Sequence, residues 1–315
     1  MSTKPTYAVA IALLAIGPAI AKAPPSASAA ITAAEATTAP VLTPAWVVAS
    51  NAYTQKLILA QAPFNPEQLS FFGVPGYDDQ VFDFGPDYAK RFRKATEKAR
   101  DVLKADSASE RDPNVQQDLA ILVRAADDAI EASEVNERLA RPWLDVGQTV
   151  FGGLQGLLSE QTPAERRPSA LDRLRRYVGQ APGSTAMVEL ARQRYTERSN
   201  PALVQPTQIE VQQSLDNLST YKAGIRELFT KYEVKGAESA LAVLDTQLDA
   251  YGKWTREVVL PTARTTYVLP AELYALSLKG VGIDLDPHVL IERAQVGFME
   301  TRAAMQQLAP RVAAE

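Results

Sequence analysis

Cysteine is absent from this sequence of 315 residues, and histidine occurs once, as His288. The lack of cysteine excludes disulfide bonds, thiolate metal ligands, a cysteine nucleophile and the lipid attachment of a bacterial lipoprotein. A catalytic zinc ion normally takes three protein ligands, largely His and Glu, which one histidine does not supply. We therefore predict no catalytic residue, no metal ligand and no cofactor in this chain.

An excess of basic charge is missing as well. The sequence has 33 Lys and Arg against 37 Asp and Glu, a net charge of −4, and an isoelectric point near 5.4. General nucleic-acid binders are normally basic. The local run "AKRFRKATEKAR" has carboxylates nearby and a helical period, which favours a solvated helix face. No nucleic-acid partner is expected.

The amino terminus has the pattern of a secretory signal. Lys4 precedes an apolar run, residues 7–16, that has the length of a signal core and is too short to span a bilayer. Ala21 and Ala23 form the preferred small-x-small cleavage site, and Ala27-Ser28-Ala29 is a second one. We predict a signal peptide over 1–23 and a periplasmic or secreted protein with no membrane association after cleavage. An uncleaved anchor helix is the alternative.

Strand patterns are absent as well, since no segment shows sustained period-two alternation. The sequence also has no glycine-rich phosphate loop and no repeat. Residues 24–44 are small and Pro/Thr/Ala-rich, which indicates a flexible linker. Over 45–315 the apolar residues recur at three- and four-residue spacing. This predicts an all-α, antiparallel array of roughly eight to ten helices, over 45–62, 86–105, 114–140, 142–160, 168–178, 184–198, 207–232, 237–257 and two more at the end.

One stretch of the helical region is irregular. Glycine and proline interrupt residues 63–86, so we expect a loop there, with Pro86 as the first residue of the next helix. The aspartates of this loop are too few for a calcium site and are predicted to form turns or caps (Asp78, Asp79, Asp83). The aromatic side chains are expected to pin the loop to the core rather than to line a ligand groove (Phe71, Phe72, Tyr77, Phe82, Phe84).

The remaining polar candidates are weak. Asp286 and Pro287 predict a helix start that places His288 in the first turn, where no catalytic role is needed to explain it. No G-x-S-x-G elbow accompanies this histidine. Carboxylates that share a helix face, such as Glu131 with Glu134 or Asp245 with Asp249, are usual on amphipathic surface helices.

Two segments resemble a known family, "LQGLLSEQTPAERRPSALDRLRRYVG" and "WTREVVLPTARTTYVLPAELYALSLKGVGIDLDPHVLIERAQVGFMETRAAMQQLA". They are similar to the amino-terminal half of the bacterial domain of unknown function 885 family, over residues 46 to 315, most specifically over 254–308. The resemblance implies an exported, helical protein related to zinc metallopeptidases of the gluzincin type. Members are expected to carry an HExxH helix, whose histidines bind zinc and whose Glu is a general base.

No HExxH motif occurs in this sequence, so no residue inherits a ligand or base role. One hypothesis is the amino-terminal region of a peptidase-like protein, inactive alone, whose peptide substrate and zinc belong to the complete protein. The alternative is a non-catalytic periplasmic helical binding or structural protein. Arg264, Tyr267 and Tyr274 lie in the best-matched segment and are candidates for a cleft.

The last predicted helix has an apolar stripe (Leu290, Ala294, Phe298, Met305, Leu308). An exposed stripe of this kind marks an interface. We therefore expect self-association through the carboxy-terminal helix.

Overall fold

The computed structural model describes residues 43–283 and 285–312. The predicted signal peptide over 1–23, with Ala21 and Ala23, lies outside the described residues, as does all but the end of the predicted linker over 24–44. The described residues divide into two units, one ending at Leu269 and the other beginning at Pro270. Each unit is described below by itself.

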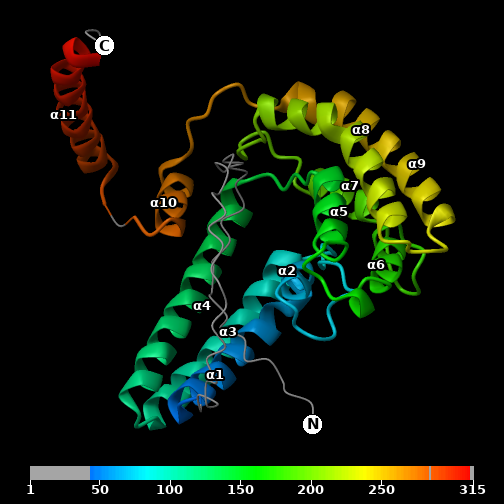
Figure 1. The fold of residues 1–315 in the computed structure, drawn as a ribbon, viewed down its shortest axis with the longest axis horizontal. Helices are drawn as coiled ribbons and strands as arrows, with labels where there is room; N and C mark the ends of the chain where they lie inside the picture. Colours follow the sequence, from blue (N-terminus) through cyan, green and yellow to red (C-terminus); the bar gives the residue numbers. More distant parts are fainter. Residues whose placement is uncertain (1–42, 284, 313–315) are drawn as a thin grey trace. The chain divides into compact units, whose positions relative to one another are not determined.

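The all-α prediction is confirmed, since the described residues form helices and no strand (Figure 1). One more helix is found than the upper end of the predicted range, because the short α2 lies in the segment predicted as a loop. The α-helices are α1 Ala45–Gln61, α2 Pro66–Phe71, α3 Tyr88–Ser109, α4 Pro113–Leu139, α5 Val146–Gln155, α6 Ser169–Tyr177, α7 Met187–Glu197, α8 Gln208–Lys231, α9 Glu238–Trp254, α10 Ala271–Gly280 and α11 Pro287–Val312.

Helices α1, α3 and α4 pack along one another as a three-helix bundle (Figure 1). Their shared core contains Leu57 from α1, Leu103 from α3, and Leu119 and Leu122 from α4, all at most 4% exposed. The turn between α3 and α4 is local in origin. Asp112 accepts a hydrogen bond from the Asn114 backbone N–H at 2.9 Å, and Pro113 occupies the first helical position.

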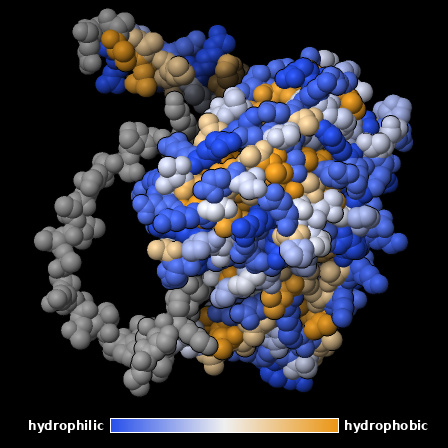
Figure 2. Space-filling model, turned by 90° about the vertical axis from the view of Figure 1, so that its right-hand side faces the viewer, coloured by the Kyte–Doolittle hydropathy of each residue, from blue (hydrophilic) through white to orange (hydrophobic). Residues whose placement is uncertain are grey.

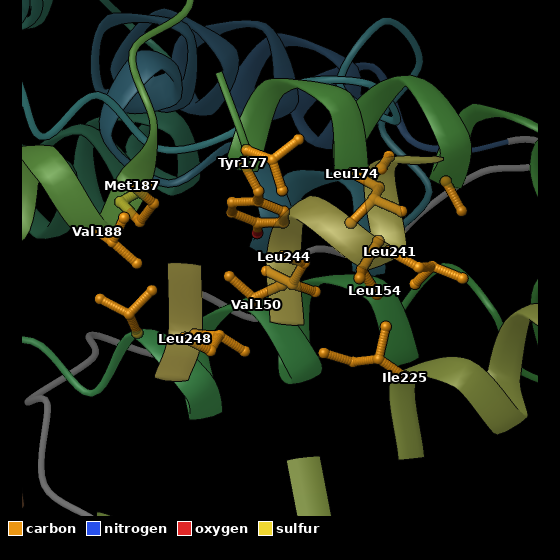
Figure 3. Packing of buried hydrophobic residues seen from close by; sticks show 14 of the residues in the cluster. Val150, Leu154, Leu174, Tyr177, Met187, Val188, Ile225, Leu241, Leu244 and Leu248 are labelled. Atoms are coloured by element: carbon orange, nitrogen blue, oxygen red, sulfur yellow. The ribbon is translucent and has the colours of Figure 1, made fainter. Parts of the chain in front are cut away.

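A second and larger core surrounds α5, which packs against α6, α7 and α8. Its apolar residues at four-residue spacing, Val146, Val150 and Leu154, are at most 1% exposed and meet side chains from the surrounding helices (Figure 3). The helix is shorter than the predicted 142–160. Asp145 caps it at one end, and Leu157 and Leu158 stay buried although they follow the helix in a turn.

The face shown in Figure 2 is mainly polar and is interrupted by small apolar areas. No helix within the described ranges is both long enough and apolar enough to cross a bilayer.

The loop between α2 and α3 is only partly as predicted. Phe84 is 5% exposed and Phe82 packs against the large core, which confirms two of the aromatic anchors. Phe71 and Phe72 instead are 61% and 42% exposed at the end of α2. The prediction that Pro86 begins the next helix is wrong. Asp87 has a φ of 54°, so the right-handed helix starts only after it, at Tyr88.

Three arginines hold this loop in place, two from beyond α5 and one from α3. The Arg166 guanidinium donates to both carboxylate oxygens of Asp78, at 2.8 Å and 2.6 Å. Arg176 of α6 pairs with Asp79 at 2.8 Å, and Arg91 of α3 pairs with Asp83. Asp83 also accepts from the Gly85 N–H, as a turn residue does. Asp78 and Asp79 do lie in a turn, as predicted, which the Gln80 N–H closes by donating to the Tyr77 carbonyl at 3.2 Å. In addition, both form ion pairs with arginines far away in the sequence.

Arg173 is the most buried of the loop's partners, with 1% of its surface exposed. It donates to the Gly153 carbonyl at 2.6 Å and to the Tyr77 carbonyl at 2.8 Å. Beside it, the Tyr177 hydroxyl donates to Glu67 at 2.7 Å, and the same Glu67 oxygen accepts from the Phe82 N–H at 3.0 Å. This polar cluster joins α2, the loop, α5 and α6.

The Asp78–Arg166 pair predicts a dependence of stability on acid pH. Burial by itself raises the pKa of Asp78, but hydrogen bonds from Arg166 and Ser70 and the nearby positive charge outweigh it, so the pKa lies below its usual value. The unfolded chain therefore takes up the proton first. The contribution of Asp78 to the free energy of unfolding is present above about pH 4 and is lost as the pH falls through the folded pKa.

Asp78→Asn is accordingly expected to lower the free energy of unfolding by about 2 kcal/mol at pH 7, since it removes a charge-assisted hydrogen-bond pair. Urea unfolding at pH 7 and at pH 3 measures the effect, and the difference from the wild type should shrink at pH 3. A difference of the same size at both pH values would contradict the assignment to the Asp78 charge.

In the second unit, proline marks the start of both helices. Pro270 directly precedes α10, and Pro287 is the first residue of α11. The Asp286 carboxylate accepts from the His288 backbone N–H at 2.8 Å, and α11 begins at Pro287. The predicted helix start is thus confirmed, and His288 lies in its first turn.

Candidate functional site

A pocket of about 300 Å³ opens where α8 begins and the chain leaves the end of α9. Arg264 is the only charged side chain among its described lining residues. The lining is completed by four more polar residues and two with large apolar parts (Thr207, Gln208, Gln212, Thr265; Ile209, Tyr267).

The first turn of α8 is fixed by its own sequence. The Thr207 hydroxyl accepts from the Glu210 N–H at 3.3 Å, and the Glu210 carboxylate accepts from the Thr207 N–H at 2.8 Å. This reciprocal capping box satisfies two backbone donors that a helix start leaves unpaired. The carboxylate also reduces the attraction of this helix start for an anion, so the pocket is not a simple anion site.

Arg264 is held by both its backbone and its side chain. Its N–H donates to the Pro206 carbonyl at 3.0 Å, and its carbonyl accepts from the Gln208 N–H at 2.8 Å, which forms a parallel bridge to Thr207. The guanidinium donates through Nε to the Gln205 carbonyl at 2.9 Å and through Nη1 to the Thr266 carbonyl. Its Nη2 donates to no acceptor within the described residues and remains available to a ligand.

The chain reaches Arg264 through an irregular helical segment. Helix α9 continues into a π-helical stretch, Thr255–Val259, and a 3₁₀ turn, Leu260–Thr262. Such π-segments insert an extra residue and are frequent at functional sites. Thr255 and Val259 are 2% and 0% exposed, so packing fixes the segment.

A buried tyrosine braces the same segment from behind. The Tyr195 hydroxyl lies 2.8 Å from Thr262 Oγ1, and its ring packs edge-on against Trp254 with 5.4 Å between centroids. The Arg141 guanidinium stacks over the ring 3.5 Å from its centroid and donates to the Tyr195 carbonyl at 3.0 Å. The wall that carries Arg264 is therefore rigid.

The pocket lining offers hydrogen-bonding groups and apolar surface side by side. Its described lining contains no Asp, Glu, His or Cys, the side chains that exchange protons most readily near neutral pH. The two glutamine amides and Arg264 offer hydrogen bonds in both directions. Gln212 Nε2 already donates one hydrogen bond, to Asp216 at 2.8 Å. Ile209 and Tyr267, 48% and 68% exposed, offer apolar contact next to them.

A second pocket, of about 430 Å³, lies at the end of α6. Its arginines are already neutralised, because Arg175 pairs with Asp172 at 3.3 Å and Arg176 with Asp79 at 2.8 Å. No unmatched charge is left for a ligand. We therefore assign this pocket to the ion pairs that hold the loop between α2 and α3.

Metal-ligating side chains do not converge in the part of the chain that the structure describes, where no group of three or more His, Cys, Asp or Glu has the arrangement of a metal site. The only histidine of the sequence, His288 in the first turn of α11, belongs to no such group within those residues.

Comparison with protein families gives one match. The model of the family described as bacterial protein of unknown function (DUF885) matches residues 66–315, well over half of the chain. The chain belongs to the DUF885 family. Comparison with curated proteins finds no match.

The DUF885 match begins at Pro66, the first residue of α2, and so excludes α1, which the predicted resemblance from residue 46 had included. It covers the loop, its arginine partners and the pocket. Of the three cleft candidates, Arg264 and Tyr267 line the pocket, whereas Tyr274 belongs to α10 in the other unit and is not among the lining residues.

Sequence reasoning missed other residues of this DUF885 chain, namely Gln208, Gln212 and the arginines that clamp the loop. The pattern around Gln208 and Gln212 indicates an amphipathic helix and does not by itself point to a binding role. The arginines of α6 recur at a three-residue spacing, Arg173 and Arg176, which a search for charges on a core-facing stripe would have found.

Proposed function

We propose that this chain is the amino-terminal helical region of an exported, zinc-peptidase-like protein of the DUF885 family, and that it binds peptide without cleaving it. The match to the DUF885 model supports the family, and the relationship to zinc peptidases is what the sequence resemblance implies. Export is supported by the signal pattern of residues 1–23, and an exported chain that begins at Pro24 on amino-terminal sequencing tests it.

The observation that carries the proposal is the pocket at Arg264. A peptide presents alternating amide donors and carbonyl acceptors, which glutamine amides and an available guanidinium N–H match. Tyr267 and Ile209 provide a surface for an apolar side chain next to these groups. Since the lining holds no general base, the pocket positions a peptide and leaves its bonds intact.

The residues of this chain do not fit a catalytic zinc ion, for which one histidine and no cysteine are too few donors. In this proposal, zinc and the hydrolytic chemistry that it supplies belong to a part of the protein outside this sequence. The chain's own residues bind and orient the peptide.

Tyr267→Ala is expected to weaken peptide binding about tenfold, equivalent to about 1.4 kcal/mol, because an exposed aromatic side chain is a typical binding anchor. Fluorescence anisotropy with a labelled pool of random peptides measures the affinity. Tyr274→Ala is the matched control, a tyrosine that is 43% exposed and lies outside the pocket, and it should leave the affinity unchanged.

The same samples, incubated with zinc and analysed by mass spectrometry, should contain intact peptides. Peptide cleavage or stoichiometric zinc binding would overturn the non-catalytic part of the proposal. An absence of peptide binding would overturn the pocket assignment and favour the alternative, a helical structural protein of the periplasm.

A further inference from the structure

Helix α11 carries a heptad pattern from Ile291 to its last residue, Val312. The spacing alternates between three and four residues, with one set at heptad position a and the other at position d (a: Ile291, Phe298, Met305, Val312; d: Ala294, Thr301, Leu308). Three successive heptads of this kind form the seam of a coiled coil. The seam runs over 22 residues, about 33 Å of helix.

This seam is exposed. No residue of α11 is buried, and its large apolar members are more than half exposed (Ile291 53%, Phe298 66%, Met305 65%, Leu308 52%, Val312 71%). Helices in proteins owe most of their stability to packing of an apolar face. The pattern therefore calls for a partner helix with a matching seam.

The side-chain volumes indicate which partner and which direction. Position a holds mostly large residues and position d has the small ones, Ala294 and Thr301. In a parallel pair of identical helices, a faces a and d faces d, so Phe298 would crowd its own copy while Ala294 would leave a void. In an antiparallel pair, a faces d. Phe298 then lies opposite Thr301, Met305 opposite Ala294, and Ile291 opposite Leu308, which gives layers of even volume.

The flanking positions are compatible with this pairing. On one side of the antiparallel seam, Gln295 lies next to Arg302 of the second copy, a neutral residue beside a cation. On the other side, Gly297 lies next to Ala304 of the second copy, and a Cβ added at Gly297 meets no atom within 4 Å. No pair of like charges faces across the seam, so the pairing carries no electrostatic penalty.

We infer that α11 pairs with α11 of a second copy of this chain as an antiparallel, two-fold symmetric two-helix coiled coil. The seam is self-complementary, as such an interface requires. The inference is independent of the peptide pocket, which lies in the other unit.

The absence of cysteine allows a clean test on the full chain. Ala294→Cys protein and Met305→Cys protein are each oxidised alone and as an equimolar mixture. The antiparallel pair predicts a reducible disulfide-linked dimer in the mixture and little in either protein alone, because residue 294 faces residue 305 of the second copy and neither residue faces its own copy. Ala303→Cys, at the outward position f, replaces Met305→Cys in a control mixture that should not cross-link.

Light scattering after size exclusion gives the second measurement. Phe298→Glu is expected to weaken the dimer at least tenfold, whereas Met299→Glu, equally exposed but outside the seam, is not. Strong cross-linking of Met305→Cys to itself would overturn the antiparallel direction. A wild-type chain that is monomeric at tens of micromolar and does not cross-link would overturn the inference and assign the seam to another partner.

Discussion

Gly153→Ala is expected to lower the free energy of unfolding by about 3 kcal/mol, an overpacking penalty combined with a lost buried hydrogen bond. A Cβ at this position would lie 2.2 Å from the Tyr177 hydroxyl oxygen and 3.2 Å from Glu67 Cγ. Tyr177 is 1% exposed and has no room to move aside. Its hydroxyl would have to leave Glu67, to which it donates at 2.7 Å.

Burial, followed by the charge of Glu67, raises the pKa of Tyr177 well above its usual value, so the hydroxyl is protonated and can donate at any ordinary pH. The Tyr177 hydroxyl therefore stays a donor to Glu67 while the chain is folded. The loss of this hydrogen bond contributes to the expected penalty across the neutral pH range.

Gly152→Ala is the matched control for this prediction. Gly152 precedes Gly153 in the same helix, and a Cβ there would meet no atom within 4 Å. Alanine favours the helix over glycine by about 0.8–1 kcal/mol, so this variant should be more stable than the wild type. Urea unfolding of both variants decides the matter. Equal effects of the two changes would show that α5 does not pack closely against Tyr177.

Arg173→Met is expected to lower the free energy of unfolding by about 2–5 kcal/mol, since each of two buried carbonyls left without a donor costs about 1–3 kcal/mol. Methionine keeps much of the volume but leaves the Gly153 and Tyr77 carbonyls without the guanidinium that they accept from. The positive charge of Arg173 also helps to keep the pKa of Asp78 low. The variant should therefore loosen the whole loop between α2 and α3.

Arg175→Met provides the comparison for Arg173→Met. Arg175 lies two residues further along α6, its side chain is 45% exposed, and it pairs with Asp172 at the surface. Its removal should change stability by about 0.5 kcal/mol at most. Limited proteolysis gives a second readout, since cleavage between residues 72 and 87 should accelerate for Arg173→Met alone. Unchanged proteolysis would contradict the role of Arg173 as a clamp.

Helix positions were predictable where the apolar period is long and the ends carry local signals. α4 and α8 differ from their predicted ranges by one residue at each end, because Pro113 and Thr207 start helices through chemistry within a few residues. The start of α11 at Pro287 followed from Asp286 in the same way. α5 was overestimated, because Leu157 and Leu158 continue its apolar pattern although the chain has already turned.

The candidate site was predictable only in part. Arg264 and Tyr267 were singled out by their segment, but their meeting with Gln208 and Gln212 depends on the parallel bridge between Thr207 and Arg264, which are 57 positions apart in sequence number. No spacing rule connects residues so distant. Tyr274 was placed with them only because it follows closely along the chain, and it belongs to a different unit.

The sequence by itself determined the all-α class and most helix ends. It also left too few histidine and cysteine donors for a usual zinc site. These properties follow from the apolar period, helix capping and composition, which are local or additive. Only the tertiary structure decided that Asp78 and Asp79 pair with arginines about a hundred residues away, that Gly153 must stay small beneath Tyr177, and that Arg264 faces a pocket. These outcomes depend on how buried polar groups find partners when distant helices pack, because an unpaired buried group costs more than the chain's local preferences can offset.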